Sequence, residues 1–129
     1  MAASNYQAGP MPSTMMHTPM TVQMLMEHGR QVFPDSRVGT FDGSSTSHVS
    51  YREIADNATR LAAALASLGI AMGDRVGTFS WNNTAHMEAY LAIPSMGAIL
   101  HTVNIRLSPE QIAYVINHAE DKALLLDAS

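Results

Sequence analysis

The chain has 129 residues, with 7 Lys and Arg against 11 Asp and Glu, so its formal net charge is −4. This length corresponds to one domain or to part of one. The weak acidity excludes a protein that grips a nucleic-acid backbone through clustered basic side chains, and the absence of Cys excludes disulfides, thiolate nucleophiles and Cys-ligated zinc. Charged residues are only 14% of the chain, against about 25% in an average soluble domain, so we expect further protein to cover part of the surface.

The N-terminal residues 1–18 are rich in Ser, Thr, Pro, Gly and Met and have no hydrophobic period, which predicts a flexible tail. The structured segment is predicted to span residues 19–129. No apolar run approaches the roughly 20 residues that a membrane helix needs. The first basic residue, Arg30, follows several prolines and comes too late for a signal peptide. We therefore expect a cytoplasmic protein without a membrane span.

The structured segment is predicted to open with a helix and a β-hairpin. Thr21 is a typical N-cap, apolar residues follow it at helical spacing, and Pro34 ends the helix. Two short strands at 38–41 and 48–51 are separated by the turn-rich segment 42–47. The helix and tail before Pro34 are also a candidate surface for forming a homo-oligomer.

The longest helix is predicted to begin at Ser50-Tyr51-Arg52-Glu53, a capping box in which the Ser and Glu side chains satisfy free backbone N–H groups. Its apolar stripe continues to Leu68, where Gly69 is the expected left-handed cap.

The rest of the chain is predicted to alternate strands and helices. We expect strands at 75–80, 98–103 and 122–127, with helices at 84–96 and from a second capping box at Ser108–Gln111. Short connections of this kind are typical of right-handed parallel crossovers, so the fold class is α/β. Because strand 98–103 is apolar on both faces, we expect it to be central in the sheet, and strand 122–127 to be buried as well.

Ligands of open α/β sheets bind beyond the carboxyl ends of the strands, which here are 80–83, 103–106 and 127–129. Trp81 lies at one of these ends. A Trp at such a place either stacks on a ligand or packs under a neighbouring subdomain, and the sequence leaves both readings open. Neither a dinucleotide-binding glycine pattern nor a P-loop is present.

The histidines are predicted to have structural roles, and the sequence offers no catalytic residue or metal ligand. His86 and Glu88 point in different directions on a helix, so they are not expected to share a metal, and we assign His86 to a solvated helix face. His101 lies in a predicted core strand, and no carboxylate lies near it in the sequence to orient it as a general base.

Four stretches in the second half of the chain point to one known family. They are Phe79–Asn83, His86–Tyr90, Ile93–Leu107 and Ile112–Asp121. Together they resemble the N-terminal region of the adenylate-forming acyl-CoA ligases, a family of AMP-dependent synthetases and ligases, and among these the medium-chain fatty acid–CoA ligases. The likeness covers about residues 19–129, and Leu-His-Thr-Val-Asn-Ile-Arg-Leu, 100–107, is its most specific part.

Members of that family use ATP and Mg2+ to form an acyl-adenylate, release pyrophosphate, and then transfer the acyl group to coenzyme A. The resemblance implies that this chain is the N-terminal part of the large domain of such a ligase, whose full-length form acts on a fatty acid, ATP and CoA. The family's phosphate loop, ribose-binding Asp and mobile C-terminal domain would all follow Ser129. The chain alone is therefore expected to be an inactive scaffold that packs against this missing downstream part.

The resemblance also suggests one binding site. In related ligases the loop corresponding to 104–107 lies near the CoA nucleotide, so Asn104 and Arg106 are candidates to contact its phosphate or adenine. The alternative is that Arg106 ties this loop to the missing subdomain.

A second hypothesis is a self-sufficient α/β binding or interaction module that uses Trp81 and the strand ends as its pocket. A reading frame that continues into a Ser/Thr/Gly-rich loop ending in Pro-Lys-Gly favours the ligase fragment.

Overall fold

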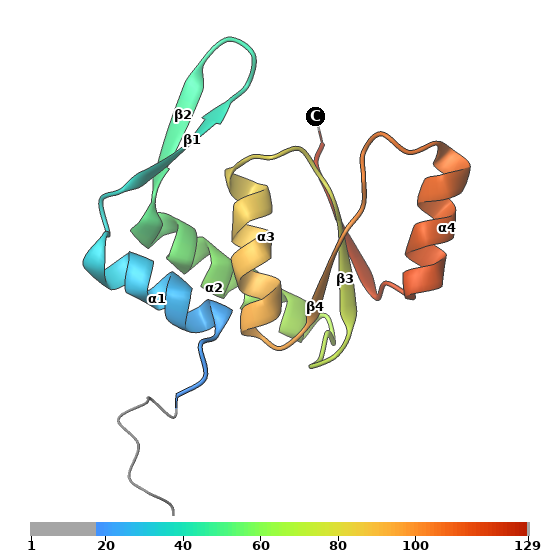
Figure 1. Cartoon of the computed structure of the whole chain (residues 1–129), viewed down its shortest axis with the longest axis horizontal. Coiled ribbons are helices and arrows are strands. Elements are labelled where there is room, and N and C mark those ends of the chain that lie inside the picture. The colour runs from blue at the N-terminus through green and yellow to red at the C-terminus, as the bar shows by residue number, and fades with distance from the viewer. Residues whose placement is uncertain (1–17, 129) are drawn as a thin grey trace, which may run out of the picture.

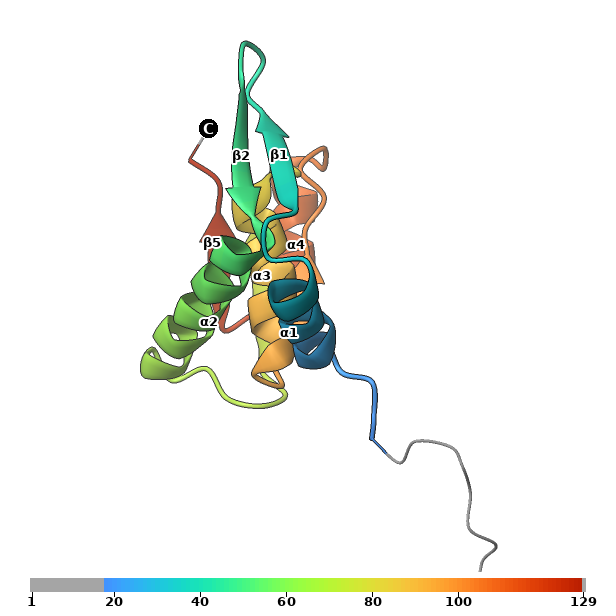
Figure 2. The same cartoon turned by 90° about the vertical axis from the view of Figure 1, so that its left-hand side faces the viewer.

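The computed structural model describes residues 18–128. Almost all of the predicted flexible tail, 1–18, lies outside these residues. The helices are α1 (Val22–Val32), α2 (Tyr51–Ser67), α3 (Thr84–Ser95) and α4 (Pro109–Ala119), and the strands are β1 (Arg37–Phe41), β2 (Thr46–Ser50), β3 (Arg75–Phe79), β4 (Ile99–Thr102) and β5 (Ala123–Leu126). Figures 1 and 2 show the arrangement of these elements.

The predicted first helix and hairpin are confirmed. The Thr21 side chain accepts a hydrogen bond from the Met24 N–H and so caps α1. Strands β1 and β2 pair antiparallel and project from the helices, with their turn at the far end (Figure 2). Close to the turn end of β1, the Thr84 N–H donates to Thr40 Oγ1 at 2.9 Å, which joins the hairpin to the first turn of α3.

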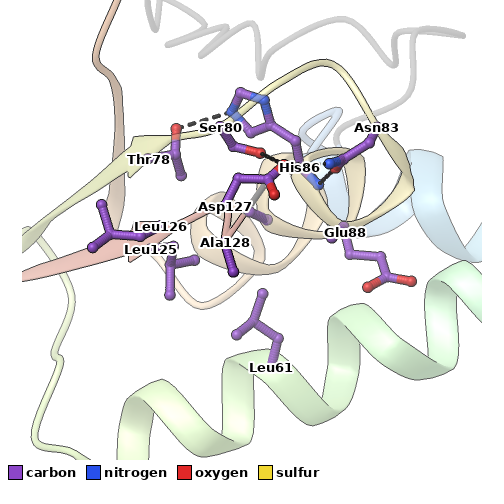
Figure 3. Close-up of a pocket in the computed structure, with 12 residues that line it drawn as sticks. Leu61, Thr78, Ser80, Asn83, His86, Glu88, Leu125, Leu126, Asp127 and Ala128 are labelled. Atoms are coloured by element: carbon purple, nitrogen blue, oxygen red, sulfur yellow. Dashed lines mark hydrogen bonds between the residues drawn. The ribbon is translucent and has the colours of Figure 1, made fainter. Parts of the chain in front are cut away.

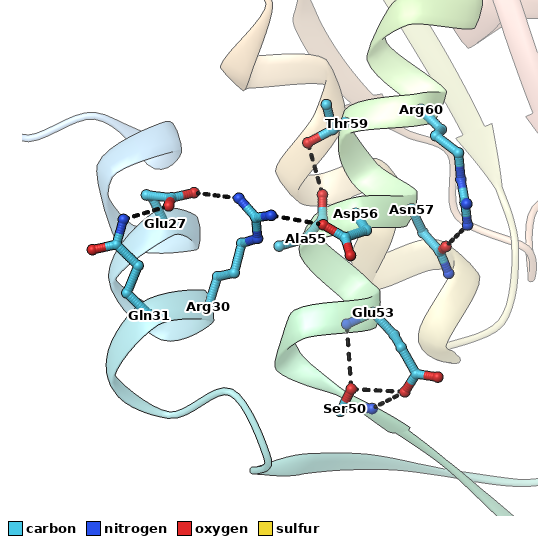
Figure 4. Close-up of polar contacts among 10 residues, drawn as sticks. All are labelled: Glu27, Arg30, Gln31, Ser50, Glu53, Ala55, Asp56, Asn57, Thr59 and Arg60. Atoms are coloured by element: carbon cyan, nitrogen blue, oxygen red, sulfur yellow. Dashed lines mark hydrogen bonds and ion pairs between the residues drawn. The ribbon is translucent and has the colours of Figure 1, made fainter.

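The predicted capping box starts α2. The Glu53 N–H donates to Ser50 Oγ, while the Ser50 hydroxyl and N–H both donate to Glu53 Oε2 (Figure 4). These hydrogen bonds from Ser50 lower the pKa of Glu53. The helix ends where Gly69 adopts a φ of 89°, the left-handed conformation expected of it.

The parallel sheet has the strand order β4-β3-β5. The chain moves to one side of β3 through α3 and then crosses back to the other side through α4. Right-handed crossovers in opposite directions place their helices on opposite faces. Figure 1 accordingly shows α3 on one face of the sheet and α4 on the other. The buried core lies on the α3 face, where residues of α2, α3 and the sheet meet: Leu65, Ile70, Val76, Ala89, Ile93 and Ala98.

The expectation that strand 98–103 is central is wrong within the described residues, because β4 pairs only with β3. Apolar residues on both faces of a strand indicate that other elements cover those faces. They do not indicate how many strands pair with its two edges. The central strand is β3. Strand β5 is the other edge, and its Leu126 is 65% exposed, so the expectation of a buried strand is also wrong at this residue.

None of the helices between residues 18 and 128 is long and apolar enough to cross a lipid bilayer.

Candidate functional site

A crevice lies between the carboxyl ends of β3 and β4. Ligands of open parallel sheets bind outside the carboxyl ends of the strands, and this crevice lies at that edge of the sheet. The cavity at this point has a volume of about 350 Å³. Its walls include Trp81, Tyr90, Thr102, Asn104 and Arg106, and we call this site the crevice.

All three residues singled out in the sequence line the crevice. Trp81 comes from the loop after β3, lines the crevice and is 57% exposed. Asn104 and Arg106 come from the loop after β4. The position at the strand ends agrees with the sequence analysis, while the role of each residue stays a prediction.

Asn104 shapes the loop that presents Arg106. The Arg106 N–H donates to Asn104 Oδ1 at 2.9 Å, which closes an Asx turn. The Arg106 side chain is exposed, and within residues 18–128 its guanidinium has no hydrogen-bond or ion-pair partner. A guanidinium held in this way can pair with a phosphate through two parallel hydrogen bonds.

His86 lines the inner part of the crevice, although the sequence analysis assigned it to a solvated helix face. That assignment is wrong, because His86 is only 8% exposed. Its Nε2 lies 2.9 Å from Thr78 Oγ1, and its Nδ1 lies 3.2 Å from the Trp81 carbonyl oxygen. Helix α3 is apolar nearly all round, so its sequence gives little indication of which face is buried. Glu88 points elsewhere and accepts a hydrogen bond from Asn57 at 2.6 Å.

A second cavity, also of about 350 Å³, lies between α2, α3 and β5 (Figure 3). Asp127 lies at its rim, where its Oδ2 accepts from Asn83 Nδ2 at 2.6 Å and from Ser80 Oγ at 3.2 Å. Asn83 Oδ1 in turn accepts from the His86 N–H at 2.9 Å and caps α3. The end of β5 therefore fixes the start of α3.

The polar groups of this second cavity do not form a nucleophile activated by a base. Ser80 Oγ lies within hydrogen-bond distance of the Trp81 carbonyl and of Asp127 and can donate its one proton to either, while the His86 ring is hydrogen-bonded to Thr78 and Trp81 instead of Ser80. Within residues 18–128 no three His, Asp or Glu side chains converge on a common metal position.

The structure gives His101 a carboxylate partner that is distant in the sequence. His101 Nδ1 lies 2.7 Å from Asp121 Oδ2, and the Asp121 side chain is 1% exposed. The contact crosses β3 over Gly77, where an added Cβ would lie 2.9 Å from Asp121 Oδ2. His101 is thus hydrogen-bonded within the sheet, as expected of a structural His, and only the three-dimensional fold could show its partner.

Comparison with known proteins identifies the family. Residues 26–129 match the sequence pattern described as AMP-binding enzyme. The chain belongs to this family of AMP-binding enzymes. Its fold is that of the N-terminal domain of the adenylate-forming ligases, and the family-level resemblance seen in the sequence is confirmed.

Two curated relatives are similar over most of the chain. The long-chain-fatty-acid–CoA ligase of Thermus thermophilus is 44% identical over 117 residues, or 90% of this chain. The medium-chain-fatty-acid–CoA ligase of Ectopseudomonas oleovorans is 40% identical over 114 residues, or 88% of this chain. The chain spans only 22% and 21% of these two AMP-binding enzymes, at their N-terminal ends.

One solved structure shows the same arrangement of elements. The N-terminal subdomain of NpsA from Klebsiella oxytoca, in complex with 3-hydroxyanthranilyl-AMSN, superposes on this AMP-binding family member with a TM-score of 0.76 and 26% identity. The superposition covers 90% of this chain and 29% of that one.

Proposed function

We propose that this chain is the N-terminal part of an AMP-forming fatty acid–CoA ligase. Its complete form would use ATP and Mg2+ to make an acyl-adenylate and would then transfer the acyl group to CoA. The observation that carries the proposal is the family match over residues 26–129, together with relatives at 44% and 40% identity that are both named fatty-acid–CoA ligases.

We propose a medium-chain substrate, in line with the relative from Ectopseudomonas oleovorans. The relative at 44% identity is named for long chains, so the acyl length needs a direct assay. The complete ligase should be tested for acyl-adenylate formation with fatty acids of graded length. A maximum at medium chain lengths supports the proposal, and a maximum at long chain lengths contradicts it.

The chain itself is proposed to be an inactive scaffold. ATP needs a phosphate cradle and Mg2+ needs clustered oxygen ligands. The sequence contains no P-loop, and within residues 18–128 no acidic cluster is brought together. The exposed Leu126 at the edge of the sheet is apolar surface that the downstream part of the ligase can cover. Detectable ATP–pyrophosphate exchange by the 129-residue chain would contradict this role.

The crevice is proposed to approach the nucleotide of CoA during thioester formation. Arg106 offers an unpaired guanidinium for a phosphate, Asn104 holds the loop that presents it, and Trp81 offers an aromatic face for the adenine. These groups fit CoA because its nucleotide combines phosphates with a planar base.

The test of this site is Arg106→Ala in the complete ligase. The KM for CoA should rise about tenfold, since a charge-assisted hydrogen bond contributes about 1.5 kcal/mol or more. ATP–pyrophosphate exchange, which precedes the CoA step, should stay unchanged. Arg52→Ala on the exposed surface of α2 is the matched control, because Arg52 does not line the crevice. Equal losses in exchange and thioester formation would show that Arg106 instead supports the fold or the subdomain contact.

A self-sufficient binding module remains the second candidate. Its pocket would be the crevice at the carboxyl ends of β3 and β4. Binding of CoA by the 129-residue chain, in the absence of any longer ligase, would support the module.

A cytoplasmic location is likewise proposed, and cell fractionation with an antibody to the chain tests it.

A further inference from the structure

We propose that His86 is a positioning residue of the crevice. Its imidazole donates Nδ1–H to the Trp81 carbonyl, accepts a hydrogen bond at Nε2 from Thr78, and so fixes the wall on which a ligand rests. His86 touches no ligand in this account and acts through Trp81. The proposed consequence for CoA rests on the function proposed above, while the positioning of Trp81 does not.

The partners of the ring decide which nitrogen carries the proton. A carbonyl oxygen can only accept, so the 3.2 Å contact with the Trp81 oxygen requires the proton on Nδ1. Nε2 of the imidazole is then an acceptor, and the Thr78 hydroxyl, 2.9 Å away, donates to it. Thr78 is only 1% exposed, so without this bond its hydroxyl would be buried unsatisfied.

His86 Nδ1 is the donor that holds the Trp81 carbonyl. Ser80 Oγ also lies 3.0 Å from this oxygen, but its single proton is shared with Asp127 Oδ2 at 3.2 Å. The imidazole N–H therefore fixes the peptide group just beyond β3. The indole extends from this peptide into the crevice.

The same imidazole supports the second aromatic wall. The ring centroids of His86 and Tyr90 are 5.0 Å apart, and the rings are tilted by 54°. Tyr90 also lines the crevice. His86 is itself fixed, because its N–H donates to the Asn83 side chain, which Asp127 holds. The ring therefore connects a rigid helix start to both aromatic residues of the crevice.

Two substitutions separate the roles of the two ring nitrogens. The amide nitrogen of Asn stands as many bonds from Cβ as Nδ1 does, whereas that of Gln stands as many bonds away as Nε2. His86→Asn should therefore keep the donor to the Trp81 carbonyl, and His86→Gln should lose it while it still reaches Thr78.

In the complete ligase, His86→Gln should raise the KM for CoA about fivefold, the factor that one net hydrogen bond contributes, with ATP–pyrophosphate exchange unchanged. His86→Asn should raise this KM less than His86→Gln, because it keeps the donor to the Trp81 carbonyl although it loses the acceptor for Thr78 and the ring beside Tyr90. The proposal is overturned if both variants behave alike, or if exchange falls together with the CoA step.

The fluorescence of the 129-residue chain supplies a readout that does not depend on CoA, because Trp81 is its only tryptophan. His86→Gln should shift the emission maximum to longer wavelength and increase quenching by acrylamide, with the far-UV circular dichroism unchanged. His86→Asn should shift the emission less than His86→Gln, because it keeps the donor to the Trp81 carbonyl. Identical emission from the Gln variant and the unmodified chain would overturn the positioning role. A complete ligase without CoA-dependent thioester formation would instead refute the proposed function.

Discussion

Gly77→Ala tests whether β3 must carry a residue without a side chain at its centre. An added Cβ would lie 2.6 Å from Leu124 Cδ1 and 2.9 Å from Asp121 Oδ2, both closer than real Cβ contacts allow. Leu124 is partly exposed and can turn its side chain away, whereas the buried Asp121 is held by His101 at 2.7 Å. The substitution therefore forces either the leucine or the buried carboxylate away from its place.

The change in the free energy of unfolding is the balance of two costs and one gain. Overpacking a well-filled site costs about 1–3 kcal/mol, and loosening the buried Asp121–His101 hydrogen bond adds about 1 kcal/mol. Replacing Gly by Ala within a strand returns about 0.5–1 kcal/mol of backbone entropy. The net loss in the free energy of unfolding should be about 2 kcal/mol, which lowers the urea midpoint by about 1 M.

Urea denaturation followed by far-UV circular dichroism, at one fixed protein concentration, measures this loss. Gly29→Ala is the matched control, because its Cβ would meet Tyr51 Cδ2 at an ordinary 3.4 Å inside α1. It should stabilise the chain by up to about 1 kcal/mol. In a Leu124→Ala background the cost of Gly77→Ala should shrink by about 1 kcal/mol, because one clash is gone. Equal stability of Gly77→Ala and the unmodified chain would refute the reasoning.

Three further perturbations probe other parts of the fold. The folded-state pKa of Glu53 is lowered by its hydrogen bonds from Ser50, so its contribution to stability is present above its ordinary pKa of 4.5 and is lost as the pH falls through the lower folded value. Between pH 6 and pH 3 the urea midpoint of Glu53→Gln should therefore fall less than that of the unmodified chain, and equal falls would exclude this contribution. Thr40→Val removes the hydroxyl that accepts the Thr84 N–H, so hydrogen exchange of that amide should accelerate about fivefold if the bond contributes about 1 kcal/mol; an unchanged rate would mean that the hairpin does not protect α3. Unpaired strand edges and exposed Leu126 should make the isolated chain self-associate in analytical ultracentrifugation, and a clean monomer with a sharp thermal transition would argue against the fragment interpretation.

Local signals in the sequence predicted the elements well. Ser50 and Ser108 each begin a helix through the reciprocal hydrogen bonds that a capping box requires. Each capping box is formed by two residues three positions apart, so it can be predicted from the sequence alone. The crevice was also located in outline, because parallel strands bring their carboxyl ends to one edge.

Contacts between distant segments could not be predicted in the same way. The sequence gives no sign that Asp121 crosses β3 to reach His101, since that contact depends on β5 pairing beside β3 and on the missing side chain of Gly77. The order of the strands was missed for a related reason, because the apolar character of β4 reflects what covers its faces. The burial of His86 was missed as well, because α3 is apolar nearly all round and its sequence does not distinguish a buried face from an exposed one.

The strand order also determines when this segment can fold. Gly77 pairs with Leu124, so the middle of the sheet gains its second neighbour only from the last strand in the sequence. Closing that long loop is entropically costly and slow, in contrast to the local pairing of the β1–β2 hairpin. On the ribosome, β3 must therefore wait with one side unpaired until β5 emerges, and a nascent chain that stops before Ala123 has half of this sheet's pairing missing.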